Sequence, residues 1–175
     1  MKNLIAPHAS ETLKPLFIND SSERDAILEQ STSLSQLLLN SAAAANTVML
    51  GAGYFTPLNG FMNKKDAISV ANNMVTTDGL FWPVPIINLT TDIGSIKESD
   101  EIALLDPNVD GTPVMATQVI ESIEVLTDSE MLNLAEKIFG TTDNKHPGVS
   151  NFLNLGNTLV SGPIKVLNYS YFPKD

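Results

Sequence analysis

Capping residues, acidic first turns and apolar residues at helix-compatible spacing mark four stretches of this 175-residue chain. Each follows a Ser, Asn or Thr that can cap a helix, and helices are predicted around residues 23–29, 42–50, 67–75 and 128–139. Ser41 is the expected cap of the second helix and Asn63 that of the third. The fourth starts with a capping box, Thr127 to Glu130, and Gly140 ends it. Its apolar positions are Met131, Leu132, Leu134, Ala135 and Ile138.

Shorter apolar runs predict strands, which are expected over residues 13–18, 80–89, 102–105 and 114–126. Residues 34–39 suit either type of element. Pro15 places the first strand at a sheet edge, and two prolines in the 80–89 run favour an edge or a bulge. Residues 158–160 and 164–169 are expected to form a hairpin around Ser161-Gly162.

Turn signals separate these elements. Asp106-Pro107-Asn108 and Asp110-Gly111 predict turns between the strands at residues 102–105 and 114–126. Residues 141–148 are expected to form a polar loop. Short strands mixed with a few helices favour an α+β fold that contains a small barrel or a bent sheet.

Residues 51–62 combine three glycines and a proline with large apolar side chains. Gly51 and Gly53 permit backbone angles that a side chain disfavours, and Pro57 fixes its own φ. Because the stretch is too apolar for an exposed loop, it is predicted to pack into a core. A phosphate cradle is the alternative, but a dinucleotide-binding fingerprint requires a third glycine and a preceding strand. The expected packing residues are Gly51, Gly53, Phe55, Pro57, Leu58, Gly60, Phe61 and Met62.

Composition excludes several classes of partner and site. The formal charge is -10, which opposes binding to nucleic acid or to an anionic membrane surface. The chain has no cysteine and two histidines, so disulfides, thiolate metal sites and histidine-rich zinc sites are not expected. No apolar run has the length of a signal peptide core or a membrane span. A cytoplasmic protein is therefore expected.

Motifs for common catalytic chemistry are missing. The sequence contains neither GxxxxGK[ST], GxSxG nor HExxH. The loop at residues 140–149 places Asp143 three residues before His146. A carboxylate can tune a histidine for proton transfer or anion contact, which would put this pair beside an active site or another domain. The structural alternative is a turn made by Asp143 and a hydrogen bond made by His146.

Five segments resemble, in order, motifs of the ATP sulfurylase (sulfate adenylyltransferase) family. The first is Gly51 to Met62, which is similar to the family's G-F-x-P-L-x-G-F-M. The others are Asp78-Gly79-Leu80-Phe81-Trp82-Pro83-Val84-Pro85-Ile86, Ala103-Leu104-Leu105-Asp106-Pro107, Gly140-Thr141-Thr142-Asp143 with His146-Pro147-Gly148-Val149, and Gly162-Pro163-Ile164-Lys165-Val166-Leu167. The version here most resembles the bacterial branch of sulfur-metabolising organisms.

The resemblance implies a single PUA-like domain over residues 1–175, with a small mixed β-barrel and several short helices. The family interconverts ATP and sulfate with adenosine 5′-phosphosulfate (APS) and diphosphate. Its catalytic motifs, with ATP and Mg²⁺, belong to a following nucleotidyltransferase domain that is expected to be absent from this chain. No catalytic residue, metal ligand or cofactor is therefore assigned here, and the catalytic domain is the expected partner.

Two other roles fit the same residues. PUA-like folds elsewhere bind RNA, so a stand-alone binding module is one alternative, although the acidic balance opposes it. The other is a regulatory or oligomerisation partner of a separately encoded catalytic subunit. Assembly into a homo-oligomer is compatible with each of these roles.

Overall fold

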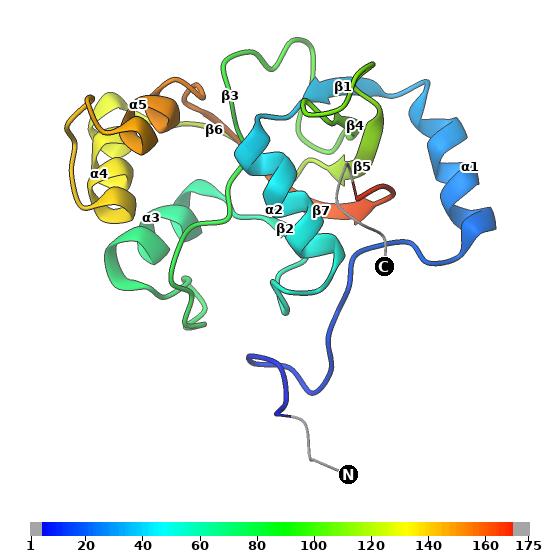
Figure 1. Cartoon of the computed structure of the whole chain (residues 1–175), viewed down its shortest axis with the longest axis horizontal. Helices are drawn as coiled ribbons and strands as arrows, with labels where there is room; N and C mark the ends of the chain where they lie inside the picture. The colour runs from blue at the N-terminus through cyan, green and yellow to red at the C-terminus, as the bar shows by residue number, and fades with distance from the viewer. Residues whose placement is uncertain (1–4, 170–175) are drawn as a thin grey trace. The chain divides into compact units, whose positions relative to one another are not determined.

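The computed structural model describes residues 5–169. The ends of the expected 1–175 domain lie outside these described residues. The described chain divides into two compact units. Their elements are labelled in Figure 1. The first unit takes in residues 5–60, 101–119 and 163–169, and the second unit takes in residues 61–100 and 120–162. Each unit is built from segments that are distant in the sequence.

Strands of the first unit form a mixed sheet. β1 (Ser35–Leu38) pairs in parallel with β4 (Glu101–Leu105), and β4 pairs antiparallel with β5 (Val114–Val119). β5 then pairs antiparallel with the last residues of β7 (Thr158–Val166), with Thr117 opposite Lys165. The strand expected over residues 13–18 is reduced to a single parallel bridge between Phe17 and Val166. The ambiguous run at residues 34–39 is thus resolved as a strand.

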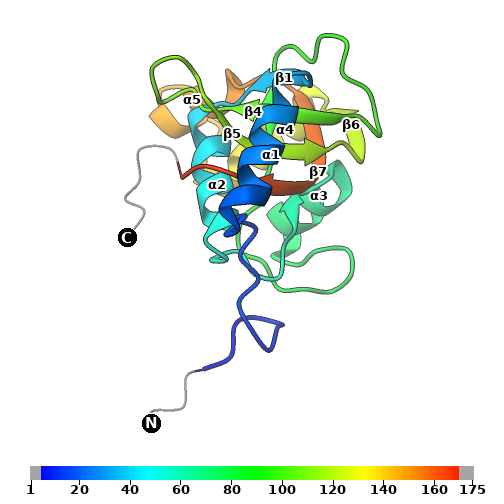
Figure 2. The same cartoon turned by 90° about the vertical axis from the view of Figure 1, so that its right-hand side faces the viewer.

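Helices α1 (Ser21–Ser31) and α2 (Ser41–Gly51) complete the first unit, and α1 contacts β5 (Figure 2). The N-cap of α2 lies one residue before the predicted Ser41, and that of α1 lies one residue before Ser21, the first of the two serines that precede residues 23–29. The side chain of Asp20 accepts the Glu23 N–H, and that of Asn40 accepts the Ala43 N–H. Asx side chains reach the exposed N–H groups of the first turn, so each takes the capping position ahead of the neighbouring serine.

The second unit surrounds an apolar cluster with three helices and short strands. Its helices are α3 (Lys64–Asn73), α4 (Asp128–Phe139) and α5 (Pro147–Leu153). β3 (Leu89–Thr90) and β6 (Ser122–Val125) each pair antiparallel with the first residues of β7, while β2 (Gly60–Phe61) is two residues long. The buried cluster consists of Ala67, Leu89, Leu126, Met131, Leu134, Ala135, Val149, Phe152 and Leu159.

Several predicted elements are wrong in detail. The strand expected over residues 80–89 is reduced to a Val75–Phe81 bridge and to β3, because Pro83 and Pro85 carry no N–H for a ladder. The long strand expected over residues 114–126 is split into β5 and β6. No hairpin forms at Ser161-Gly162. β7 is one continuous strand across these residues, because strands that are distant in the sequence pair with both of its halves.

Two helix predictions had different outcomes. α4 begins and ends as predicted, with both hydrogen bonds of the capping box and Gly140 at φ 74° as its C-cap. α5 was missed because Pro147 and Gly148 were taken for loop residues. Proline is well suited to the first turn of a helix, where its missing N–H would have no partner. In the described residues, five helices and a mixed sheet make the fold α+β.

Replacing Gly51 with alanine tests how closely α2 approaches β7. A Cβ at Gly51 would lie 2.9 Å from Val166 Cγ1 and 3.1 Å from its Cβ. Alanine favours a helix by about 1 kcal/mol over glycine. Overpacking costs about 1–3 kcal/mol, so we expect Gly51→Ala to lower the free energy of unfolding, measured by urea denaturation. In the Val166→Ala background, Gly51→Ala should cost less than it does in the unaltered chain; strictly additive effects would rule out the clash.

Replacing Glu130 with glutamine tests the link between α3 and α4. Glu130 Oε2 lies 2.8 Å from Lys64 Nζ and also accepts the Thr127 N–H at 2.7 Å. The hydrogen bond from Lys64, followed by that from Thr127, lowers the pKa of the Glu130 carboxyl below its usual value. A glutamine amide would keep an acceptor for the cap but lose the charge. At neutral pH we expect Glu130→Gln to lower the free energy of unfolding by about 0.5–1 kcal/mol.

The lowered pKa of Glu130 makes the stability difference between the unaltered chain and Glu130→Gln depend on pH. A carboxyl whose pKa is lower in the folded state stabilises it at pH values above the unfolded-state pKa, here 4.5. That stabilisation disappears as the pH falls through the folded-state pKa. Chemical denaturation of the unaltered chain and of Glu130→Gln, from neutral pH to the lowest pH at which both fold, tests this. The gap between their free energies of unfolding should close as the pH falls. A gap that is independent of pH would contradict the ion pair.

Candidate functional site

Residues 51–60 form a compact structure at the end of α2. Gly53 has φ +81°, and a Cβ there would lie 3.1 Å from the backbone nitrogen of Pro15. The buried Thr56 Oγ1 donates to the Gly53 carbonyl at 2.7 Å and accepts the Lys14 N–H at 2.9 Å. The Thr56–Pro57 peptide is cis. Glycine is therefore required at position 53, and threonine at position 56 ties the loop to the segment before α1.

This loop does not have the hydrogen-bonding capacity of a phosphate cradle. Gly53 N–H donates to Leu50, Tyr54 N–H to Met49 and Thr56 N–H to Gly53. Phosphate cradles depend on several backbone N–H groups that point at the ligand, whereas here these three donors serve the turn itself. The arrangement favours packing over anion binding.

The expected packing residues differ in burial. Gly51, Gly53 and Gly60 are buried in the first unit, where Phe55, Pro57 and Leu58 are half-buried. In the second unit, Phe61 and Met62 are buried, and Met62 N–H donates to the Ile86 carbonyl at 2.8 Å. Tyr54 differs from the expectation of a wholly packed loop, since 71% of it is exposed. The role of these residues as a family signature stays a prediction.

Asp143 and His146 lie in one tight turn before α5. Asp143 Oδ1 accepts the Lys145 N–H at 2.9 Å, and the Asp143 carbonyl accepts the His146 N–H at 2.9 Å. His146 is the N-cap of α5: its Nδ1 accepts the Val149 N–H at 3.4 Å. The imidazole centroid lies 5.7 Å from that of Phe139. Each side chain therefore has a structural contact, and both residues are exposed.

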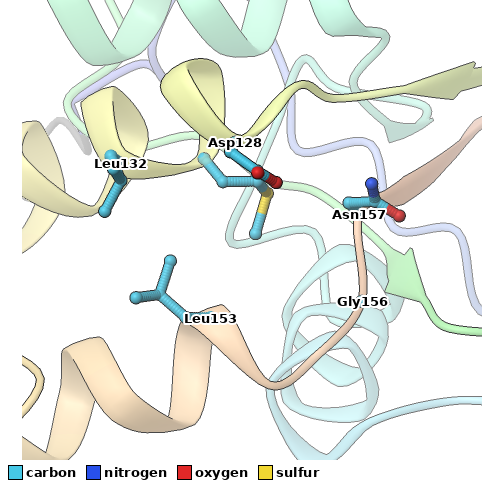
Figure 3. Close-up of a pocket in the computed structure, with 6 residues that line it drawn as sticks. Asp128, Leu132, Leu153, Gly156 and Asn157 are labelled. Carbon is cyan, nitrogen blue, oxygen red and sulfur yellow. The ribbon is translucent and has the colours of Figure 1, made fainter.

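A pocket of about 400 Å³ opens in the second unit between the start of α4 and the end of α5. Figure 3 shows Leu132 and Leu153 facing each other, with Asp128 and Asn157 at the other end. The lining residues are Asp128, Met131, Leu132, Leu153, Gly156 and Asn157. Asn157 Nδ2 donates to the Leu126 carbonyl at 3.1 Å, which holds this side chain in place. None of the six residues is cationic, so the pocket suits an apolar group better than sulfate or phosphate.

This pocket was not predicted from the sequence. Leu132 was expected among the apolar positions of its helix, yet 43% of it is exposed. Its neighbours Met131 and Leu134 are buried. The width of the apolar stripe was the available signal, because Leu132 lies at one edge of the stripe that the five apolar positions of this helix form.

A second cavity, of about 300 Å³, lies in the first unit. Its charged lining residues are Glu101 and Lys165; the rest are Leu16, Asn59, Thr117, Val119, Pro163 and Ile164. One carboxylate and one ammonium provide no net positive charge for an anion. Among the described residues, no group of three or more His, Asp or Glu side chains is placed to hold a metal ion. Within residues 5–169, no helix has both the length and the apolar content to span a bilayer.

Known proteins share both the fold and the sequence of this chain. A sulfate adenylyltransferase of Alcanivorax borkumensis is 52% identical over 175 residues, which cover 100% of this chain and 44% of that protein. One of Allochromatium vinosum is 45% identical over 172 residues, covering 98% of this chain and 43% of that protein. The chain thus spans less than half the length of these curated relatives. The resemblance to sulfate adenylyltransferases is confirmed.

Structure comparison supports the same fold. The hexameric APS kinase from Thiobacillus denitrificans superposes with a TM-score of 0.67 at 22% identity, over 98% of this chain and 28% of that one. At this identity the likeness concerns the fold alone. A family model described as a PUA-like domain matches residues 5–169. The expected α+β, PUA-like fold is therefore confirmed, and the chain belongs to the PUA-like domain family.

Proposed function

We propose that this chain is the PUA-like, N-terminal part of a sulfate adenylyltransferase, an enzyme that interconverts ATP and sulfate with APS and diphosphate. The observation that carries the proposal is the 52% identity, over the whole chain, to a sulfate adenylyltransferase of which it covers 44%. In this proposal the chain packs against the catalytic part of the enzyme and supports its assembly. ATP and Mg²⁺ bind to that other part.

The chemistry of the described residues supports a role outside catalysis. Adenylyl transfer to or from sulfate requires positive charge around phosphate and sulfate oxygens. Asp128 is the one charged residue lining the larger pocket, and the smaller cavity pairs Lys165 with Glu101. The ammonium of Lys64 is engaged by Glu130 and by the Val125 carbonyl. The net charge of -10 also favours placing the residues that bind anions on the catalytic part rather than on this chain.

Two activity measurements test this proposal. The 175-residue chain alone should form no ATP from APS and diphosphate. A chimera in which it replaces the matching segment of the Alcanivorax borkumensis enzyme should be active, because 52% identity preserves most packing contacts. The unaltered enzyme is the positive control, and circular dichroism confirms that each protein is folded. Turnover by the chain alone, or a folded chimera without activity, would contradict the proposal.

We also propose that the exposed turn of Asp143 and His146 contacts the catalytic part near its site. His146→Asn in the active chimera separates this role from capping, because asparagine is a good N-cap but lacks an imidazole. Losing one hydrogen bond to a charged group costs about 1.5 kcal/mol, so kcat/KM should fall by about tenfold while Tm is unchanged.

Comparing His146→Ala with His146→Asn isolates the contribution of the N-cap to stability. It removes both the imidazole and the cap, so it should lower kcat/KM to a similar extent and also lower the free energy of unfolding by about 1 kcal/mol. Kinetics of His146→Asn equal to those of the unaltered chimera would restrict His146 to its structural role.

A further inference from the structure

The loop that joins β4 to β5 carries oxygen-bearing side chains at alternate positions. Its sequence is Asp106-Pro107-Asn108-Val109-Asp110-Gly111. Asp, Asn and Asp at the first, third and fifth positions, followed by glycine at the sixth, is the spacing with which calcium-binding loops begin. The residues of this loop predict turns, and Asp106 and Pro107 also belong to a segment that resembles the sulfate adenylyltransferase family. The spacing by itself does not make a site, since Asp, Asn and Gly also dominate ordinary turns.

The carboxylate of Asp106 provides an independent observation. Asp106 is 0% exposed, although Asp is rarely buried without a partner. Its Oδ1 accepts the Asn108 N–H at 2.9 Å, a contact within the loop. Its Oδ2 is buried and has no hydrogen-bond partner among the described residues. A buried, unpaired carboxylate oxygen is costly, and a bound cation would remove that cost.

The loop closes on itself, because Asp106 N–H donates to the Pro113 carbonyl and Thr112 N–H donates to the Val109 carbonyl. Gly111 has φ +80°, the sharp turn that a calcium loop needs at its sixth position. Asn108 and Asp110 are exposed and can reorient around an ion. Asn108 Oδ1 already accepts the Ser41 hydroxyl at 2.8 Å.

We propose that this loop binds a calcium ion. The protein ligands are Asp106 Oδ2, Asn108 Oδ1, the Asp110 carboxylate and the backbone carbonyl of Thr112, with water completing the shell. Only two of these ligands are acidic side chains, so the site is not one of the groups of three or more His, Asp or Glu side chains considered above. Calcium is favoured over magnesium because it accepts many oxygens in a flexible arrangement, whereas magnesium requires a nearly ideal octahedron.

The affinity of this loop for calcium should be low. The twelfth position of the loop, where a calcium loop commonly has a bidentate glutamate, is Thr117, which is buried in β5. The N-terminal end of α2 also lies beside the loop, as the Ser41–Asn108 hydrogen bond shows, and its partial positive charge opposes a cation. With two carboxylates and no glutamate, we expect a Kd of about 10⁻⁴–10⁻³ M.

Calcium titration of the 175-residue chain at constant ionic strength tests the site. Isothermal titration calorimetry and Tm both report binding, since a ligand of the folded state raises Tm. Asn108→Asp should tighten binding several-fold by adding a charged ligand, and Asp110→Asn should weaken it by a similar factor. The control is Asp92→Asn, which removes the same charge from another exposed turn, where Asp92 accepts the Gly94 N–H. Asp106 itself is left unaltered because its burial makes misfolding a risk.

The outcomes separate a site from diffuse attraction of cations to an acidic surface. Loss of affinity in Asp110→Asn, retention in Asp92→Asn and a gain in Asn108→Asp would support the site. Equal affinities in all four proteins, or the absence of binding in both the unaltered chain and Asn108→Asp, would overturn it. Equal affinity for magnesium would overturn the assignment to calcium.

Discussion

The close approach of Gly51 to Val166 is the constraint on which the first unit depends. Residues 16–18 run between the end of α2 and the end of β7 and bond to both. Leu16 N–H donates to the Leu50 carbonyl and Phe17 N–H to that of Gly51, while Ile18 N–H donates to Val166 and Val166 N–H to Leu16. A Cβ at position 51 would lie 2.9 Å from Val166 Cγ1, so glycine is the residue that fits there without displacing the valine. The ring of Phe17 also stacks on Tyr169 at 4.3 Å between centroids.

This constraint explains why residues 51–60 are rich in glycine without binding a ligand. Directly after the contact at Gly51 the chain reverses, and the turn uses its own N–H groups to do so. The same features, glycines beside aromatics, first suggested either a phosphate cradle or a packed loop. The hydrogen-bond pattern favours packing, because a donor that already has a good partner gains little from an anion.

Signals confined to a few residues were the ones that could be predicted from the sequence. The capping box at Thr127, the cap at Asn63 and the stop at Gly140 are each complete within one helical turn, and each has the expected geometry. The hairpin at Ser161-Gly162 was wrong because β7 pairs with strands that are distant in the sequence, as Ala116 opposite Val166 shows. A local pattern contains no information about those partners.

The candidate sites were predictable to different degrees for a similar reason. His146 and Asp143 stood out because they share one short loop, and the structure does place them in one turn. The pocket at Leu132 and Leu153 was missed because it forms where two helices meet, and α5 was not predicted. The buried state of Asp106 could not be foreseen either, since its sequence neighbourhood is that of an exposed turn.

The acidity of the chain places a condition on the proposed enzyme. Its substrates and products are all anions, and a net charge of -10 repels them at short range. At physiological ionic strength, charges are screened over about 8 Å, so the repulsion matters only for acidic side chains near the path of the substrates. In the proposed enzyme, positive groups of the catalytic part would either shield that path from this domain or bind the acidic groups of the domain. The second arrangement uses the charge for assembly, and both are consistent with pockets here that offer no net positive charge to an anion.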